Sequence, residues 1–254
     1  MIIDTHSHIY LPEFRDDLDQ MLTRAENEAI NLILMPAIDN ETHQSMLEIE
    51  AQYPGKSLSM MGLHPCSVKE GYKQELKIVE EYLEKRRFVA VGETGLDFYW
   101  DRTFTKEQYA SFQIQIELAK QYNIPVVIHS RNSIDDCIKV IRENQQGNLK
   151  GVFHCFSGNE QQAKEIIALG FYLGIGGVVT FKNSGLDKVM VDIDIKNIVL
   201  ETDAPYLAPV PFRGKRNECS YLRYVVEKLA QIKNIAKEEV AKMTTKNAKE
   251  LFSI

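Results

Sequence analysis

Cysteine is scarce in this chain, and its four copies are widely separated. They stand at Cys66, Cys137, Cys155 and Cys219, and no two of them form a C-x-x-C pair. This spacing excludes a disulfide framework and is typical of reduced, unpaired thiols in a cytosolic protein. The cysteines therefore predict a cytoplasmic location.

Long apolar runs are also absent. No run approaches the ~20 residues that a membrane-spanning helix needs. The chain enters its first apolar stretch without the basic segment that opens a signal peptide. We therefore expect no contact with a membrane, and nothing in the sequence indicates an obligate protein partner.

An excess of positive charge is missing as well. Lys and Arg number 30 against 36 Asp and Glu, which gives a formal net charge of -6 at pH 7. This balance excludes a protein that coats nucleic acid through a general basic surface. A polyanionic substrate would have to be held locally, by metal ions or by a few arginines and lysines.

The chain does contain a regular alternation of apolar runs and helix-like segments. Eight apolar runs begin near residues 2, 31, 57, 88, 124, 149, 171 and 197, and a helix-like segment follows each. Because crossover connections are right-handed, such alternation predicts parallel strands in a TIM (β/α)8 barrel, here a single domain over residues 1–254. A doubly wound open sheet would alternate too, but it gives no reason for metal-binding residues to follow six strands.

Residues suited to metal binding stand at the ends of these runs. His6 and His8 form an H-x-H pair, and two residues of separation on an extended chain place both imidazoles on one face. The full set is His6, His8, His64, Glu93, His129, His154 and Asp203, with Glu93 just beyond its strand. The carboxyl ends of barrel strands open onto one face, so these residues are expected to meet there.

Each of these residues has an ordinary alternative when taken alone, as a loop, core, capping or turn residue. Together, buried imidazoles and carboxylates would lose much solvation without a cation, so the set predicts a metal site. We expect two divalent ions, of Mg, Mn, Zn or Ni. His6, His8, Glu93 and Asp203 would bind one ion, and Glu93, His129 and His154 the other, with His64 left as a donor to substrate.

Two smaller features also make predictions. The T-x-x-Q pattern at Thr105–Gln108 is that of a capping box at a helix start. His43 lies near the start of another helix and is expected on the surface.

The motifs read in order resemble the TatD family of metal-dependent deoxyribonucleases. They are D-T-H-S-H at 4–8, G-L-H-P at 62–65, G-E-T-G-L-D at 92–97, H-S-R at 129–131, H-C-F-S-G at 154–158, E-T-D-A-P-Y-L at 201–207 and R-G-K-R-N at 213–217. The first motif alone would indicate only the wider amidohydrolase-like superfamily. Cys219 departs from the pattern, which has proline there.

This resemblance implies a TIM-barrel hydrolase that cleaves phosphodiester bonds in DNA with divalent metal ions at the positions named above. It further implies a 3′ to 5′ exonuclease acting on single-stranded ends, in a soluble cytoplasmic protein. The expected catalytic residues are Glu93, Asp203 and His64, with Asp203 taking a proton from water.

Basic residues near the candidate ligands suit a phosphate-bearing substrate. Arg131 follows His129 by two positions, and Arg213, Lys215 and Arg216 come soon after Asp203. With His64, they are the predicted substrate-binding residues, although such charges are often solvated loop residues.

Three aromatic residues follow Glu93 closely in the sequence: Tyr99, Trp100 and Phe104. Two roles are open for them. They would stack on a terminal base, as aromatics do in single-strand binding, or fill the space under a long loop. The sequence favours the second.

Two rival functions stay open from the sequence alone. An amidohydrolase or esterase would act on a small carbonyl substrate, including an aminoacyl-tRNA ester, with the same metal centre. A metal-binding regulatory protein would keep the site without turnover.

Overall fold

Eight parallel strands form the centre of the molecule in the computed structural model, which describes residues 1–254. They are β1 Ile2–Asp4, β2 Ile30–Met35, β3 Ser57–Ser59, β4 Val91–Asp97, β5 Val126–Arg131, β6 Gly151–Phe153, β7 Tyr172–Ile175 and β8 Ile198–Leu200. Four of them, β1, β4, β6 and β8, are buried along their whole length, and buried strands of this kind appear in the sequence as continuous runs rather than alternating ones.

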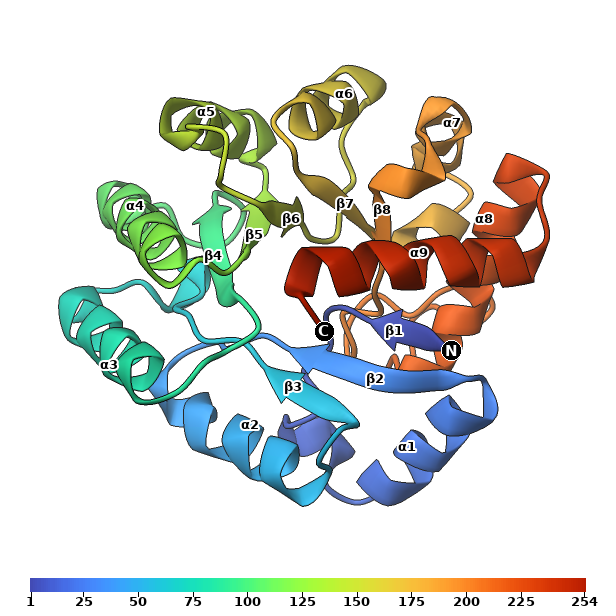
Figure 1. Cartoon of the computed structure of the whole chain (residues 1–254), viewed down its shortest axis with the longest axis horizontal. Helices are drawn as coiled ribbons and strands as arrows, with labels where there is room; N and C mark the ends of the chain where they lie inside the picture. Colours follow the sequence, from blue (N-terminus) through green and yellow to red (C-terminus); the bar gives the residue numbers. More distant parts are fainter.

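The strands close into a ring (Figure 1). Continuous pairing runs from β1 to β3 and from β4 to β8. Two parallel bridges join these parts, Met61 with Val91 on one side and Ser7 with Ala204 on the other. The prediction of a TIM barrel is confirmed, and the open doubly wound sheet is excluded.

Helices surround the ring, as Figure 1 shows. They are α1 Leu18–Asn27, α2 Asn40–Gln52, α3 Tyr72–Lys85, α4 Thr105–Tyr122, α5 Ile134–Asn144, α6 Glu160–Ala168, α7 Leu186–Asp192, α8 Leu222–Lys233 and α9 Lys237–Phe252. In α5, for example, Cys137, Ile138 and Ile141 are buried at helical spacing against the ring. None of these helices is long and apolar enough to cross a membrane.

The last helix, α9, has no strand after it and lies across one end of the ring in the view of Figure 1. Its residues Ala248, Leu251 and Phe252 are buried in an apolar cluster with strand residues such as Ile3 and Val199. This packing closes the end of the barrel at which the strands begin. The opposite end, where the strands finish, is therefore the end left for a site.

The structure corrects two local predictions. The N-cap of α4 is Phe104, and the Gln108 side chain is buried, where it accepts a hydrogen bond from the Asp97 backbone N–H at 2.9 Å. The predicted capping box is thus wrong, because Gln108 pairs with β4 instead. His43 is also buried, with its Nε2 3.3 Å from the Gly62 carbonyl oxygen, so its predicted surface position is wrong.

Candidate metal centre

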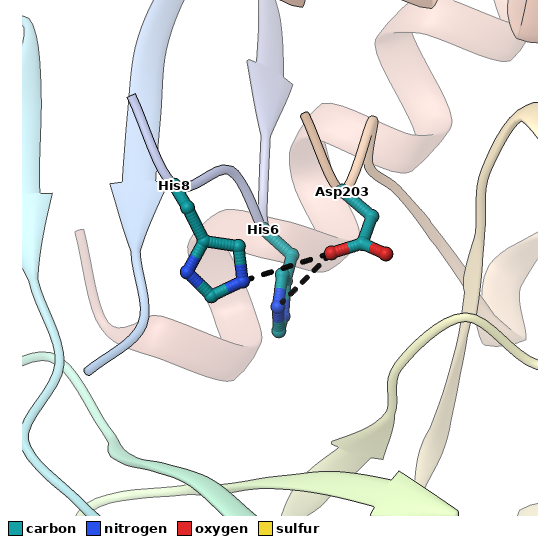
Figure 2. A group of neighbouring side chains, drawn as sticks. All are labelled: His6, His8 and Asp203. Atoms are coloured by element: carbon teal, nitrogen blue, oxygen red, sulfur yellow. Dashed lines mark ion pairs between the residues drawn. The ribbon is translucent and has the colours of Figure 1, made fainter. Parts of the chain in front are cut away.

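His6 and His8 lie on the extended segment that continues beyond β1, and Asp203 lies just beyond β8. Backbone hydrogen bonds from Asp203 N to His6 O (2.9 Å) and from His8 N to Ala204 O (2.8 Å) lock the two segments together. Nε2 of each histidine then lies 3.7 Å from Oδ1 of Asp203 (Figure 2). Three residues from opposite ends of the chain form one compact group.

Glu93 lies inside β4, whereas the sequence placed it just beyond the strand. Val91 pairs with Val126 and Thr94 with Ile128, so three steps along β4 match two along β5. This irregularity is a β-bulge, which changes the direction of a side chain within a strand. The Glu93 carboxylate is buried and turns toward the histidines.

The two carboxylate oxygens of Glu93 face different histidines. Oε2 lies 3.1 Å from Nε2 of His6 and 3.6 Å from Nε2 of His8. Oε1 lies 2.8 Å from Nδ1 of His129 and 2.8 Å from Nε2 of His154. One side chain therefore stands between two sets of imidazoles.

All seven predicted residues come together at the carboxyl end of the barrel. Their ligand atoms form three groups with all atoms within 4.8 Å of one another: His6, His8 and Asp203; His6, Glu93 and His154; and His64, Glu93 and His129. The second group links the other two, so the arrangement is continuous.

Hydrogen bonding fixes the tautomer of His8. The Tyr10 hydroxyl donates its single hydrogen to the Pro36 carbonyl at 2.6 Å, so it must accept the bond that joins it to Nδ1 of His8 at 2.9 Å. Neutral His8 thus carries its proton on Nδ1. Its Nε2 lone pair points at the carboxylates of Glu93 and Asp203. Lone pairs directed at one another repel, and a cation bound between them would remove this repulsion.

The same reasoning separates His64 from the other histidines. Its Nδ1 accepts a hydrogen bond from the Cys66 backbone N–H at 3.0 Å, so neutral His64 carries its proton on Nε2. That Nε2–H faces Oε1 of Glu93 at 3.4 Å. His64 is therefore arranged as a hydrogen-bond donor, whereas His8 is arranged as a metal ligand.

Asp97 contacts His129 on the side of the ring that faces away from Glu93. Its Oδ2 lies 2.8 Å from Nε2 of His129, while Nδ1 of the same ring faces Glu93. Burial alone would raise the pKa of Asp97, but His129 and the backbone N–H groups of Trp100 and Tyr99 hold this pKa well below its ordinary value. A charged carboxylate behind a histidine orients the ring and increases its basicity toward a metal.

The acidic groups of the centre have shifted pKa values. Burial opposes ionisation of Glu93, but the facing His154, His64 and His6 imidazoles hold its pKa well below the ordinary value. Burial raises the pKa of Asp203 to about 6, although His154 and His6 act in the opposite direction. Glu93 is therefore ionised at neutral pH. The pKa of Asp203 lies about one unit below neutral pH, so a small part of this carboxylate is protonated there.

These donors fit divalent metal ions. Imidazole nitrogens and carboxylate oxygens are the ligands that zinc and similar ions take in hydrolases. The residues are buried, and the cost of burying charge is much reduced when a cation joins the carboxylates to the imidazoles. The lone-pair direction of His8 agrees with such an ion.

The predicted basic residues occupy different surroundings. Arg131 is the last residue of β5, and its guanidinium lies over the Tyr99 ring at 3.7 Å from the centroid. Arg213 lies over Phe181 at 4.0 Å, and Lys215 lies 5.8 Å from the Phe212 ring centroid. None of the three forms an ion pair, so their charges are available to an anion.

Arg216, by contrast, is already paired with protein groups. It donates to Oδ1 and Oδ2 of Asp17, at 2.6 and 2.8 Å, and to the Glu13 carbonyl oxygen at 2.6 Å. Its guanidinium also stacks on Phe14. The structure thus gives Arg216 a role in fixing the loop after β8 against the segment before α1.

Three further residues of the site were not predicted from the sequence: Asp97, Tyr10 and Glu201. Asp97 and Tyr10 could have been found by continuing the alternation, since Asp97 follows Glu93 by four positions and Tyr10 follows His8 by two. Glu201, whose Oε1 lies 3.5 Å from Nδ1 of His154, precedes Asp203 by two positions and carried the same signal.

A comparison with family models decides the relationship. The model described as TatD related DNase matches residues 3–253. The chain belongs to this TatD family. Its resemblance to the family and its assignment to the hydrolase class are thereby confirmed.

Individual relatives agree with this assignment. The chain is 37% identical to the uncharacterized metal-dependent hydrolase YabD of Bacillus subtilis, over 100% of both chains. It is 32% identical to the uncharacterized metal-dependent hydrolase YcfH of Escherichia coli, over 100% of this chain and 96% of that one. The crystal structure of YjjV, a TatD homolog from E. coli, superposes with a TM-score of 0.93 at 30% identity and covers 100% of this chain and 98% of its own.

Proposed function

We propose that this protein hydrolyses phosphodiester bonds at single-stranded DNA ends, from the 3′ side, with two divalent metal ions. The observation that carries the proposal is the position of Glu93, whose two oxygens face separate sets of imidazoles. A carboxylate in this position is suited to bridge two ions. Membership of the TatD family supports DNA as the substrate.

The residues divide between the ions as follows. His6, His8, Asp203 and Oε2 of Glu93 would hold one, while His129, His154 and Oε1 of Glu93 would hold the other. Two such ions would supply Lewis acidity for the attacking and the leaving oxygen and would lower the pKa of water.

Asp203 would act as the general base. Figure 2 shows one of its carboxylate oxygens directed at His6 and His8 and the other directed away from both rings. The second oxygen is free to accept a proton from the attacking water. A carboxylate with a pKa of about 6 is largely ionised at neutral pH, as a general base must be.

His64, Arg131, Arg213 and Lys215 would bind the substrate phosphates. His64 offers Nε2–H beside Glu93, and the three basic side chains are free of ion pairs. An Arg213→Ala variant should raise KM for DNA with little change in kcat, because its charge binds substrate and transition state alike. An unchanged KM would remove Arg213 from the binding surface.

The test is product analysis with end-labelled single-stranded DNA. Protein stripped of metal is reloaded with Mg, Mn, Zn or Ni, and the bound ions are counted for each chain. We expect two ions per chain and mononucleotides released from the 3′ end. Cleavage by stripped protein, or intact DNA with every ion, would contradict the proposal.

The same assay includes esters and amides, aminoacyl-tRNA esters among them, because the metal centre would also polarise a carbonyl group. Turnover of these substrates with intact DNA would identify an amidohydrolase or esterase instead.

A further inference from the structure

Two aromatic side chains next to the metal centre are left in solvent. Tyr99 is 52% exposed and Trp100, the only tryptophan of the chain, is 69% exposed. Their neighbours Phe98 and Phe104 are partly buried and pack against the core. The predicted filling role therefore suits Phe104, while Tyr99 and Trp100 cover nothing of the core.

The loop that carries these two rings is fixed rather than loose. Oδ1 of Asp97 accepts hydrogen bonds from the backbone N–H groups of Tyr99 (2.9 Å) and Trp100 (3.1 Å). Oδ2 of the same carboxylate faces His129 of the metal centre at 2.8 Å. The buried Asp97 carboxylate thus contacts the loop of the aromatic pair with one oxygen and the candidate ligand His129 with the other.

Arg131 completes this surface. It pairs in register with Asp97 across β4 and β5, and its guanidinium lies 3.7 Å from the Tyr99 ring centroid and 5.3 Å from that of Trp100. The two rings are perpendicular, with centroids 4.9 Å apart. No side-chain hydrogen bond or ion pair with the protein occupies the Arg131 guanidinium, so its N–H groups face solvent.

An exposed indole beside an unpaired arginine points to a particular kind of ligand. A planar, uncharged ring system gains stacking energy on such aromatic faces, and a phosphate attached to it meets the free guanidinium. Nucleotides combine both features. In a duplex the faces of the bases are stacked on one another. Only an unpaired base can therefore stack on these two aromatic rings.

We propose that Tyr99, Trp100 and Arg131 form a nucleobase shelf that binds an unpaired base of the substrate strand next to the scissile phosphodiester. This inference rests on the proposed function and specifies it further. Contact between the shelf and an unpaired base would make the enzyme prefer single-stranded ends. The metal centre contacts only the phosphate and would give no such preference. Trp100 supplies the stacking face, and Arg131 supplies the charge for a neighbouring phosphate.

Trp100 also provides the direct test, because all tryptophan fluorescence of the chain comes from it. Metal-loaded protein is titrated with a single strand whose 3′ linkages are phosphorothioates, which slow cleavage. The matched strand carries abasic residues at its three 3′ positions. We expect the strand with bases to quench the emission and the abasic strand to bind more weakly by about 5- to 100-fold, with little quenching. Equal quenching by both strands would overturn the proposal.

Kinetics of variants give an independent measurement. Trp100→Ala should raise KM for single-stranded DNA by about 5- to 100-fold, and Trp100→Phe, which keeps a ring, should recover most of this loss. On the abasic strand, wild type and Trp100→Ala should be equal. Ile114→Ala, which removes an exposed apolar side chain on α4, is the matched control and should leave KM unchanged. An equal effect of Trp100→Ala on both strands would overturn the shelf.

The experiment separates failure of the shelf from failure of the proposed function. Cleavage of single-stranded DNA that is indifferent to Trp100→Ala would refute the shelf and leave the nuclease activity standing. Quenching of Trp100 by dAMP in a protein that leaves all DNA intact would support the shelf and refute the nuclease activity.

Discussion

The two ends of the barrel are built from different kinds of residue. At the end where the strands begin, α9 covers the ring with Ala248, Leu251 and Phe252, and the strand residues that meet them are apolar. At the end where the strands finish, the interior holds five histidines with Glu93, Asp97 and Asp203. Apolar packing is therefore concentrated at one end of the barrel, and the candidate metal ligands are concentrated at the other.

This difference shows how the fold tolerates so many buried ionisable groups. A buried carboxylate among imidazoles contributes little to stability by itself, and the apolar end and the helix layer supply the cohesion. Substitutions at the two ends should consequently affect different measurements.

The largest effect is expected at the reactive end from Glu93→Gln. Loss of one carboxylate charge between the two sets of histidines should reduce kcat/KM on the order of 10³-fold or more, since this residue serves both groups. Turnover with reloaded metal is the measurement. Glu50→Gln, which changes a carboxylate paired with Arg86 outside the site, is the control and should retain activity.

The next effect is expected at the apolar end. Phe252→Ala removes a buried ring from the cluster under the strands and should lower the free energy of unfolding by about 3 kcal/mol. Chemical denaturation measures this loss. At a temperature where the variant is folded, kcat should match that of wild type; a matching fall in kcat would show that the two ends are coupled.

Asp97→Asn tests the support behind His129. The amide keeps the shape but loses the charge that faces Nε2 of His129, so metal affinity or activity should fall by about 10- to 100-fold. The measurement is metal titration of stripped protein together with kcat. Asp136→Asn is a matched control, because Asp136 accepts a hydrogen bond from Tyr109 on the outside of the barrel. Equal values for Asp97→Asn and wild type would remove Asp97 from the centre.

The smallest effect is expected from Asp17→Asn, which breaks ion pairs with Arg216 and Arg24 at the reactive end. Hydrogen bonds from Arg216 and Arg24 hold the pKa of Asp17 well below its ordinary value, despite some desolvation. The contribution is present above the unfolded pKa of about 3.9 and is lost as pH falls through the folded pKa. We expect a loss of about 1 kcal/mol, constant from about pH 8 to 5 and smaller below about pH 4. Activity at pH 7 should persist, and its loss would show that the contact between Asp17 and Arg216 also holds the metal centre in place.

Much of the fold could be predicted because each strand is a short, buried run between amphipathic helices. The same regularity predicted which residues would meet, since parallel strands bring their carboxyl ends to one face. The bulge at Glu93 could not be predicted, because it depends on the register between β4 and β5. Gln108 and His43 were misjudged for a similar reason: each is buried because its side chain pairs with a backbone group of another segment, which the helix pattern does not show.

The hydrogen bonds between the segment after β1 and the segment after β8 also determine when the site can form during synthesis of the chain. The contacts that close the ring are those that bring Asp203 to His6 and His8. A nascent chain that has not yet released its last strand from the ribosome holds the histidines without this carboxylate. The proposed metal centre is thus complete only once the segment after β8 has joined the barrel, and fragments truncated before β8 should be inactive.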